Sequence, residues 1–463
     1  MDQTYDVVVI GAGPVGENAA DYAIRGSKRT ALLIENELVG GECSYYACMP
    51  SKALLRPVEV RATAENLQGL PDQLQLDPVA LLRRRDTWVS GYQDAGQVKW
   101  ANGAGIDVAR GYGRISGPGR VDIESEAGVR TVTARHAVVV ATGSRPVVPD
   151  FLQGLEPWTS RDATGIVEVP ESIAVIGGGV VAVEAAHWLA ALGSRVTMLV
   201  REQRVLTRLD PFAAELVVAG LQQIGIEVVF GALVTDAQRP AAAASGLGRV
   251  HGGPVQLMVN GRMQQFAEVL AATGRRPATE DLGLSSVGLS PESFADAAAR
   301  PAWLYAVGDA SGETPLTHWG KYRARLVGAQ IAARAEGRPQ PEAPEEVPVP
   351  QVVFSDPQVA AVGITEEAAR RAGITVRCPQ VPMASASGYA LLRDDAPGQA
   401  QLVVDADTGR LLGATFVGTE VAELVHAATV AIVGGMTVSQ LWHAVPSYPT
   451  SSEVWLRLLE QSQ

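Results

Sequence analysis

The chain contains 463 residues, of which 47% are hydrophobic and 19% are charged, a composition typical of globular proteins with two or three domains. Its formal net charge of −12 and its lack of a basic cluster argue against nucleic acid as a partner. No apolar run reaches the roughly 18 residues of a membrane-spanning helix, so no membrane insertion is expected. The N-terminus lacks the pattern of a signal peptide, and we therefore expect a cytoplasmic protein.

The first predicted element is a buried strand that runs into a glycine-rich turn. Val7–Ile10 is a short apolar run, as in parallel strands that are buried on both faces. Gly11, Gly13 and Gly16 follow it, and after a helical segment a second apolar strand ends at Glu35. In a βαβ unit this order binds a dinucleotide, because the glycines let the backbone approach the pyrophosphate and the acid binds the ribose hydroxyls.

Two of the three cysteines lie in the next segment, residues 40–52, which reads Gly-Gly-Glu-Cys-Ser-Tyr-Tyr-Ala-Cys-Met-Pro-Ser-Lys. The spacing of Cys43 and Cys48 differs from that of zinc ligands, so no metal site is expected, and the chain is too large for a disulfide-stapled fold. The pair stands where a loop turns into a helix, and there the positive end of the helix dipole lowers the pKa of a thiol. We interpret the pair as a redox-active disulfide; the alternative is two unrelated buried cysteines.

The dinucleotide pattern occurs a second time between residues 173 and 200, where Gly177, Gly179 and Ala182 follow an apolar strand. Two such units in one chain predict two bound dinucleotides. The second unit ends without an acid, and Arg201 and Arg204 stand beside the strand end. Arginines at that position favour a 2′-phosphate, and hence NADPH over NADH, unless they only solvate the strand end.

Two Ala-Thr-Gly motifs bracket this second unit, with Gly143 in the first and Gly274 in the second. Further on, a predicted strand ends in Gly308 and Asp309. A carboxylate at the end of a buried strand requires hydrogen-bond donors, which a bound hydroxyl or the start of a helix provides. From about Glu336 the sequence becomes rich in proline, as in a linker.

Taken together, these motifs resemble those of the pyridine nucleotide–disulfide oxidoreductases, the family of dihydrolipoamide dehydrogenase, glutathione reductase and mercuric reductase. The cysteine signature is the most specific match, although Ala47 stands where the family usually has glycine. The resemblance covers nearly the whole chain. It implies an α/β fold with two Rossmann-like dinucleotide-binding domains, for FAD and NAD(P), and a C-terminal α/β dimerisation domain.

The resemblance also implies the domain boundaries and a homodimer. The expected parts are a first part of the FAD-binding domain at 1–150, an NAD(P)-binding domain at 151–272, the second part of the FAD-binding domain with a linker at 273–345, and the dimerisation domain at 346–463. The residues implied for FAD are Gly11, Gly13, Gly16, Glu35, Gly143, Gly308 and Asp309. Those implied for NAD(P) are Gly177, Gly179, Ala182, Arg201, Arg204 and Gly274.

In this family NAD(P)H delivers hydride to the flavin, and the flavin reduces the cysteine disulfide. Cys48 matches the thiol that faces the flavin, and Cys43 matches the thiol that attacks the substrate. Lys52 matches the lysine near flavin N5, and Glu184 matches its acidic partner. A buried lysine requires such a counter-charge, because an unpaired ion in a dry site would lose its proton.

The C-terminal segment departs from the family pattern. Disulfide-reducing relatives have His-Pro-Thr-x-Ser-Glu there, contributed across the dimer, and the histidine, held by the glutamate, is the catalytic acid–base. This chain has Tyr448 in place of the histidine and keeps the glutamate as Glu453. A tyrosine with a pKa near 10 cannot exchange its proton at neutral pH as an imidazole does.

The small-molecule acceptor is therefore left open. One hypothesis is a disulfide, with Tyr448, water or the substrate supplying the proton; the alternative is a quinone that takes electrons directly from the flavin. Tyr45 and Tyr46, between the cysteines, either shape a site for such a flat acceptor or simply pack. Mercury is disfavoured because the C-terminus has no cysteine pair. A third, non-enzymatic hypothesis, a flavin-loaded redox sensor, is disfavoured by the complete set of nucleotide motifs.

Overall fold

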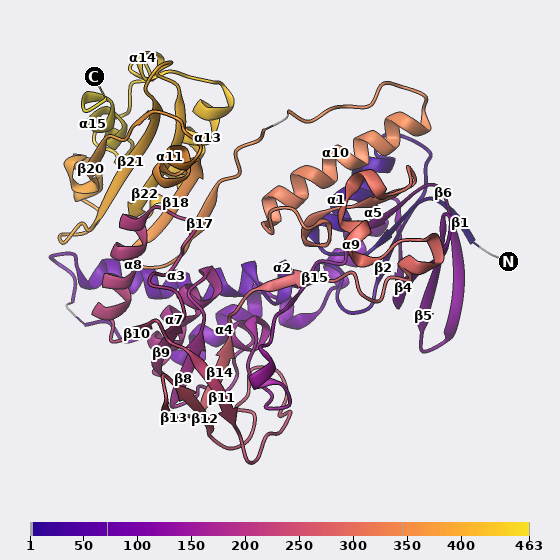
Figure 1. Ribbon diagram of the computed structural model, residues 1–463, viewed down its shortest axis with the longest axis horizontal. Helices are drawn as coiled ribbons and strands as arrows, with labels where there is room; N and C mark the ends of the chain where they lie inside the picture. The colour runs from indigo at the N-terminus through magenta and orange to yellow at the C-terminus, as the bar shows by residue number, and fades with distance from the viewer. Residues whose placement is uncertain (1–2, 72, 345, 463) are drawn as a thin grey trace. The chain divides into compact units, whose positions relative to one another are not determined.

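The computed structural model describes residues 3–71, 73–344 and 346–462. Contacts between residues divide the chain into two compact units, each assembled from three separate segments (Figure 1). The first unit comprises 1–50, 86–147 and 275–345, and the second comprises 51–85, 148–274 and 346–463. Helix α3 (Cys48–Glu65) and helix α4 (Pro78–Trp88) each begin in one unit and end in the other.

The first unit is built on a seven-stranded sheet whose central strands are parallel. The parallel strands are β3 (Ile106–Arg110), β2 (Ala31–Glu35), β1 (Gln3–Ile10), β6 (Gly128–Val140) and β16 (Leu304–Ala306). Two antiparallel strands, β5 (Arg120–Ser125) and β4 (Tyr112–Gly117), extend the sheet from β6. The central strand β1 is an apolar run because both of its faces are buried.

Two helices, α1 (Pro14–Ile24) and α10 (Thr317–Ala335), pack against each other beside this sheet (Figure 1). Small residues make the close approach possible. A Cβ added at Gly328 of α10 would lie 2.7 Å from the Cβ of Tyr22 and 2.9 Å from the carbonyl oxygen of Ala19, both on α1. The two helices therefore approach closely enough at Gly328 that no side chain fits between them there.

The second unit contains a parallel four-stranded sheet, and its strands in spatial order are β10 (Glu227–Phe230), β9 (Arg195–Val200), β8 (Ser172–Ile176) and β14 (Glu268–Ala271). Helices α7 (Val180–Ala191) and α8 (Pro211–Gln223) contribute to its core, which includes the buried Trp158 and Trp188. A separate antiparallel sheet consists of β11 (Val234–Gln238), β12 (Val255–Val259) and β13 (Arg262–Phe266).

The C-terminal part of the second unit forms a six-stranded antiparallel sheet. Its strands are β17 (Gln351–Val353), β18 (Gln358–Gly363), β22 (Leu411–Gly418), β21 (Gly398–Asp405), β19 (Val376–Arg377) and β20 (Gln380–Pro382). Helices α13 (Leu424–Val433) and α15 (Val454–Glu460) pack onto it around Phe416. Shorter helices elsewhere are α2 (Gly41–Tyr45), α5 (Ala95–Gly103), α6 (Ser160–Thr164), α9 (Pro291–Ala295), α11 (Glu366–Arg371), α12 (Ser387–Ala390) and α14 (Val438–Leu441).

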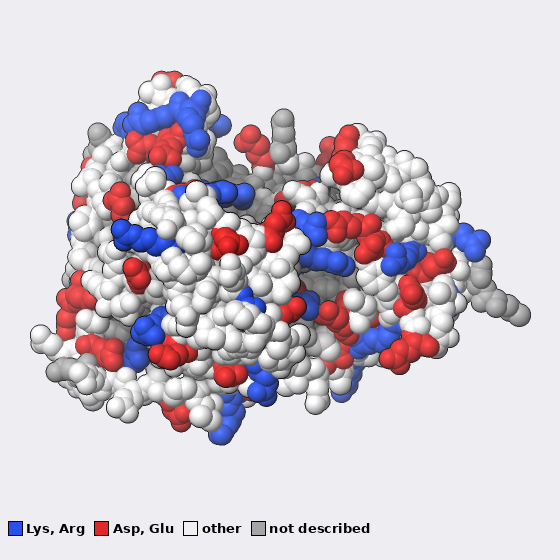
Figure 2. Space-filling view, turned by 60° about the horizontal axis from the view of Figure 1, so that its bottom comes forward, with Lys and Arg blue, Asp and Glu red and all other residues white. Residues whose placement is uncertain are grey.

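The predicted fold class, two Rossmann-like α/β domains with a C-terminal α/β domain, is confirmed. Over the described residues, no helix combines the length and apolar character needed to cross a bilayer. In the same residues no group of three or more His, Cys, Asp or Glu side chains is arranged to hold a metal ion. On the face shown in Figure 2, basic and acidic side chains are interspersed and form no continuous basic surface.

Candidate active site

The structure brings Cys43 and Cys48 together in the first unit as a pair of thiols. Cys43 lies in the short helix α2, and Cys48 is the first residue of α3. Thr317, the first residue of α10, donates a hydrogen bond from Oγ1 to Cys43 Sγ at 3.3 Å, and Cys48 Sγ lies 3.4 Å from the same oxygen. One hydroxyl thus contacts both sulfurs, an arrangement that no sequence motif announces because 274 residues separate Thr317 from Cys43.

The pKa of the Cys43 thiol is raised by its hydrogen bond with Cys48 and, in second place, by burial. The hydrogen bond from Thr317 and the positive charge of Lys321 act in the opposite direction. The prediction that the helix dipole lowers the thiol pKa is therefore wrong for Cys43. The neighbouring thiol and the loss of solvent are the two largest causes of the rise, and the helix that begins at Cys48 does not contain Cys43.

The first glycine-rich turn has the geometry of a dinucleotide cradle. A Cβ at Gly16 would lie 2.0 Å from the carbonyl oxygen of Gly11, so the start of α1 packs directly on the turn. Gly13 differs, because a Cβ there would meet only the Cα of Gly41, at 3.9 Å. The turn is therefore tight where helix and strand meet and open where a pyrophosphate would approach.

Two carboxylates flank this cradle. Glu35, at the end of β2, accepts hydrogen bonds from the backbone N–H groups of Ala12 at 2.8 Å and Glu37 at 2.9 Å, so its carboxylate holds the turn, and its contact with a ribose stays a prediction. Glu17, at the start of α1, has a buried Oε1 without a hydrogen-bond partner, and burial raises its pKa to about 7. A buried carboxylate oxygen without a hydrogen-bond donor can accept a bond from a hydroxyl group of a ligand. The ribose of FAD has such hydroxyl groups, so this arrangement fits FAD.

The flavin motif around Asp309 joins a polar chain that reaches the cysteine helix. Ser144 donates a hydrogen bond to Asp309 at 2.5 Å, and Arg275 donates to the Ser144 hydroxyl at 2.8 Å. Arg275 also lies 3.4 Å from Glu42, the residue before Cys43. Sequence reasoning missed Ser144 and Arg275, although each follows the glycine of an Ala-Thr-Gly motif and carries a polar side chain.

The remaining glycines predicted for FAD lie at the same edge of the first unit. Gly143 precedes Ser144 with φ of +72°, and a Cβ there would meet no atom within 4 Å. Gly308 precedes Asp309 with φ of +66°, and a Cβ there would lie 3.1 Å from the side chain of Val15 in α1. Both are positions of left-handed backbone that favour glycine.

The second glycine-rich turn repeats the pattern in the second unit. A Cβ at Gly177 would lie 2.3 Å from the carbonyl oxygen of Ala272, whereas one at Gly179 would meet nothing within 4 Å. Ala182 is fully buried in α7. Gly274 has left-handed backbone with φ of +118° and open space around it. The cradle is open at Gly179, where the backbone of such a turn approaches a pyrophosphate, so these residues also fit a dinucleotide.

The two arginines predicted to select NADPH have different surroundings. Arg201 has an exposed side chain that pairs at 2.8 Å with its neighbour Glu202. Arg204 is less exposed and pairs with Glu367 at 3.1 Å and with the carbonyl oxygen of Thr207 at 3.1 Å. Arg201 is therefore the more accessible of the two for a 2′-phosphate.

Lys52 and Glu184 form an ion pair in the second unit, with Nζ 2.6 Å from Oε2. The other carboxylate oxygen of Glu184 accepts the backbone N–H of Phe354 at 3.0 Å, and Lys52 Nζ lies 4.6 Å from the centre of the Phe354 ring. The carboxylate is almost fully buried, whereas the lysine keeps about a third of its side-chain exposure. The predicted partners are thus in contact, and the position of Lys52 near the flavin stays a prediction.

The C-terminal residues are not brought together. Tyr448 is 74% exposed, whereas Glu453 is buried. The carboxylate of Glu453 accepts the backbone N–H of Ser387 at 3.2 Å and pairs with Arg457 at 3.0 Å. Within the described residues no hydrogen bond joins Tyr448 to Glu453, so the glutamate holds its own segment rather than a catalytic side chain.

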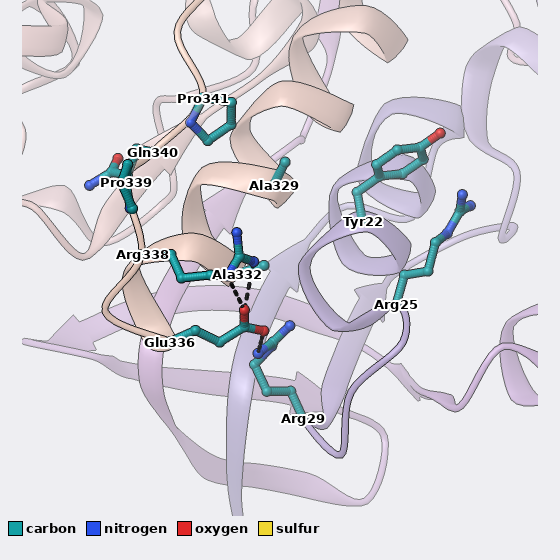
Figure 3. A pocket seen from close by; sticks show the side chains of 10 residues that line it. All are labelled: Tyr22, Arg25, Arg29, Ala329, Ala332, Glu336, Arg338, Pro339, Gln340 and Pro341. Carbon is teal, nitrogen blue, oxygen red and sulfur yellow. Dashed lines mark hydrogen bonds and ion pairs between the residues drawn. The ribbon is translucent and has the colours of Figure 1, made fainter.

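A hollow of about 390 Å³ lies elsewhere on the first unit, between the end of α1 and the end of α10. Figure 3 shows Arg29 and Arg338 both turned toward the carboxylate of Glu336. A third arginine, Arg25, pairs with Asp21. The positive charges of the hollow are thus matched by carboxylates, and none of the predicted site residues lines it.

Comparison with known proteins agrees with this geometry. The pattern of the family described as "Pyridine nucleotide-disulphide oxidoreductase" matches residues 5–332, and that of its dimerisation domain matches residues 349–458. The dihydrolipoyl dehydrogenase of Thermus scotoductus is 33% identical over 97% of this chain and 96% of its own length. The mercuric reductase of Staphylococcus aureus is 28% identical over 98% of this chain and 81% of its own length.

Among solved structures, the HOCl-induced flavoprotein disulfide reductase RclA from Escherichia coli shares the fold. Its TM-score is 0.83 at 23% identity, over 99% of this chain and 100% of that one.

Proposed function

This chain belongs to the pyridine nucleotide–disulfide oxidoreductase family, and on that premise we propose that it is an NADPH-dependent reductase of a small-molecule disulfide. The family is FAD-dependent and uses a pyridine nucleotide, so the chain is a flavoprotein enzyme. The match to the dimerisation domain supports a homodimer. We assign it to the cytoplasm, where reductants keep a dithiol in its active cycle.

The observation that carries this proposal is the contact of both sulfurs with Thr317. When bound, FAD relays the two electrons of a hydride from NADPH to the disulfide of Cys43 and Cys48. The hydroxyl of Thr317 and the hydrogen bond between the two thiols keep the sulfurs adjacent after reduction. Oxidation of the two thiols back to a disulfide then supplies two electrons and two protons, which convert an acceptor disulfide into two thiols.

The proton balance differs from that of relatives with a C-terminal histidine. Because the pKa of Cys43 is raised, its thiol must give up a proton before the sulfur can attack the acceptor disulfide. Tyr448 is exposed and has no hydrogen bond with Glu453 within the described residues, so water is the proposed route for the proton. A positioned general acid contributes roughly 10²- to 10⁴-fold in rate, and we expect disulfide turnover slower than in histidine-containing relatives by a factor of that order.

A second candidate function is quinone reduction with electrons leaving directly from the flavin. The observation that favours it is the C-terminal segment, where Glu453 is occupied by Ser387 and Arg457 and no histidine stands at position 448. Such a reduction requires no acid at that position. In this reaction the electrons do not pass through the cysteine pair. A substitution of Cys43 therefore distinguishes the two candidate functions.

The test is NADPH oxidation by the FAD-loaded enzyme with lipoamide, glutathione disulfide or a naphthoquinone as acceptor. Cys43→Ser is compared with the wild type, and Cys378→Ser is the matched control because that thiol lies on a different element, after β19. Loss of disulfide reduction in Cys43→Ser alone supports the proposed function. Quinone reduction that survives Cys43→Ser, with negligible disulfide reduction in the wild type, supports the second candidate. Negligible oxidation with every acceptor contradicts both and revives the redox-sensor hypothesis.

A further inference from the structure

Glu17 is a buried acidic residue at the start of α1, directly after the first glycine-rich turn. It is 9% exposed, and its Oε1 atom has no hydrogen-bond partner. A polar group that is buried without a partner destabilises a protein, and it does so more strongly when it is charged. Neither the dinucleotide motif nor the family resemblance gives this position a role, so its burial requires a reason that lies in the structure.

The backbone holds Glu17 close to the open part of the turn, where a pyrophosphate would approach. Its N–H group donates a hydrogen bond to the carbonyl oxygen of Gly13 at 3.0 Å, so Glu17 lies one helical turn after the open glycine. The charge of Glu35 acts on Glu17, and the same Glu35 carboxylate accepts the backbone N–H of Ala12. Glu17 therefore belongs to the group of residues that fit FAD.

The titratable groups that act on Glu17 come from three neighbouring elements. Lys321 of α10 lowers the pKa of Glu17, and Glu35 of β2 raises it. Tyr45 of α2 has a pKa that is raised to about 12, first by burial and to a lesser extent by charges that include Glu17. Strands β1 and β6 also pack on α1, and they contribute apolar residues to the shared core. Burial is the largest influence and raises the pKa of Glu17 to about 7, so about half of these groups are uncharged at pH 7.

A pyrophosphate at this turn favours the uncharged form further. It carries negative charge and is attracted to the N-terminal end of the helix. An ionised Glu17 would add a negative charge at the same helix end, and like charges in a buried site oppose ionisation. The uncharged acid avoids this repulsion, and it has one hydroxyl that donates a hydrogen bond and a second oxygen that accepts one. It can therefore contact both a phosphate oxygen and a ribose hydroxyl.

We propose that Glu17 is a further FAD-binding residue, which contacts the cofactor as an uncharged carboxylic acid, so that above neutral pH the binding of FAD takes up a proton from water. When FAD leaves, the proton returns to the solvent. FAD is consequently held more tightly at acidic and neutral pH than at alkaline pH. The binding of FAD does not depend on which acceptor the enzyme reduces, so the inference stands or falls independently of the proposed function.

The test is the release of FAD from the diluted holoenzyme at pH 6 and pH 8.5, with free FAD separated by ultrafiltration to give a Kd. The Kd of the wild type is expected to rise about 10- to 30-fold between these pH values, because a carboxylate with a pKa of about 7 in the free protein must gain a proton before FAD binds. Glu17→Gln keeps the shape and a hydrogen-bonding group but cannot ionise, so its Kd is expected to change by less than about 3-fold.

Asp21→Asn is the matched control. Asp21 lies one turn further along α1 and pairs with Arg25, so this variant removes a carboxylate from the same helix and is expected to keep the pH dependence of the wild type. Glu17→Met has a similar volume and serves as a second variant if Glu17→Gln does not fold. It is expected to lose the pH dependence and, because it has no hydrogen-bonding group, to raise the Kd at pH 6 about 3- to 10-fold.

Three results would overturn the inference. One is a Kd of the wild type that does not change with pH, and another is a Glu17→Gln variant that keeps the pH dependence of the wild type. The third is a loss of the pH dependence in Asp21→Asn. A role in packing alone would also give equal Kd values at pH 6 for Glu17→Gln, Glu17→Met and the wild type, and that result would contradict a contact between Glu17 and FAD.

Discussion

The hydroxyl of Thr317 donates a hydrogen bond to the sulfur of Cys43 at 3.3 Å, across 274 residues of sequence. This bond lowers the pKa of Cys43 and partly offsets the effect of Cys48 and of burial. Thr317→Val removes the donor without changing the volume much. We expect alkylation of Cys43 by iodoacetamide in the reduced, flavin-free protein at pH 8 to slow about 2- to 10-fold, the equivalent of one hydrogen bond.

Peptide mapping by mass spectrometry follows Cys43 separately from the other thiols. Thr317→Ser keeps the hydroxyl and is expected to react close to the wild-type rate. Equal rates for the valine and serine variants would show that the hydroxyl has no influence on the thiol.

The contribution of the Lys52–Glu184 ion pair to stability can be tested by substitution of Glu184. Glu184→Gln removes the charge from a buried carboxylate while retaining an oxygen for the Phe354 N–H. We expect a loss of about 1–3 kcal/mol in the free energy of unfolding, measured in urea, because Lys52 is left without its counter-charge. Glu171→Gln is the control, since Glu171 pairs with Arg195 on an exposed surface and such pairs contribute less than about 1 kcal/mol. Equal losses in both variants would contradict the prediction.

Glu17 predicts a pH dependence of stability. Burial raises its pKa from 4.5 to about 7, the charge of Lys321 opposes the rise, and the charge of Glu35 adds to it. The folded protein therefore binds more protons than the unfolded chain between these values, so stability falls as pH rises from about 4.5 to 7 and is level above that range. Glu17→Gln is expected to gain stability relative to the wild type across this window, by about 3 kcal/mol at most.

The measurement is urea unfolding of the flavin-free protein at pH 4.5 and pH 8. The two proteins are expected to differ more at pH 8 than at pH 4.5. A difference that does not change with pH would mean that the carboxyl titrates normally.

Coenzyme choice is tested at Arg201, whose side chain is exposed at the end of β9. A charge-assisted contact with a 2′-phosphate is worth about 1.5–3 kcal/mol, so Arg201→Ala is expected to raise the KM for NADPH by 10-fold or more and to leave that for NADH nearly unchanged. Arg204→Ala is the comparison, and a smaller effect is expected because Arg204 is occupied by Glu367. A parallel rise in both coenzymes would contradict a role in recognising the phosphate.

The left-handed backbone at Ser90 gives a prediction for stability. Ser90 has φ of +51°, a conformation that costs a residue with a side chain about 1–2 kcal/mol and glycine almost nothing. Ser90→Gly is expected to stabilise the protein by about 0.5–1 kcal/mol in urea unfolding, once the greater freedom of glycine in the unfolded chain is subtracted. Ser125→Gly, in a strand, is the control and is expected to destabilise. A destabilised Ser90→Gly would show that the serine side chain compensates for its backbone.

The fold is predictable from the sequence because its signals are local. The glycine-rich turns at residues 11–16 and 177–182 each follow an apolar strand and precede a helix, so a short window contains the whole βαβ pattern. The ion pair of Lys52 and Glu184 followed from a family resemblance rather than from the residues alone, because 132 positions separate them.

Other parts of the site depend on contacts that a local pattern does not contain. The residues around Thr317 in the sequence form no motif that would identify it as a site residue. The pKa of Cys43 is raised by the neighbouring thiol and by burial, and neither cause can be read from the residues next to it in the sequence. Sequence also gives no means of separating Tyr45, which packs in the core, from Tyr46, which stacks on Tyr92. The distinction depends on a turn at Ser90 that lies 44 positions after Tyr46 along the chain.

The packing of α10 against α1 at Gly328 affects the position of the Thr317 hydroxyl, which contacts both cysteines. Thr317 is the first residue of α10, and Gly328 stands 11 residues later, about 16 Å along the same helix. A helix transmits displacement as a rigid rod, so a larger side chain at Gly328 would push α10 away from α1 and carry the Thr317 hydroxyl with it. Natural variation at this glycine would then alter thiol reactivity while leaving every residue of the redox centre intact, and a catalogue of active-site positions would not reveal the cause.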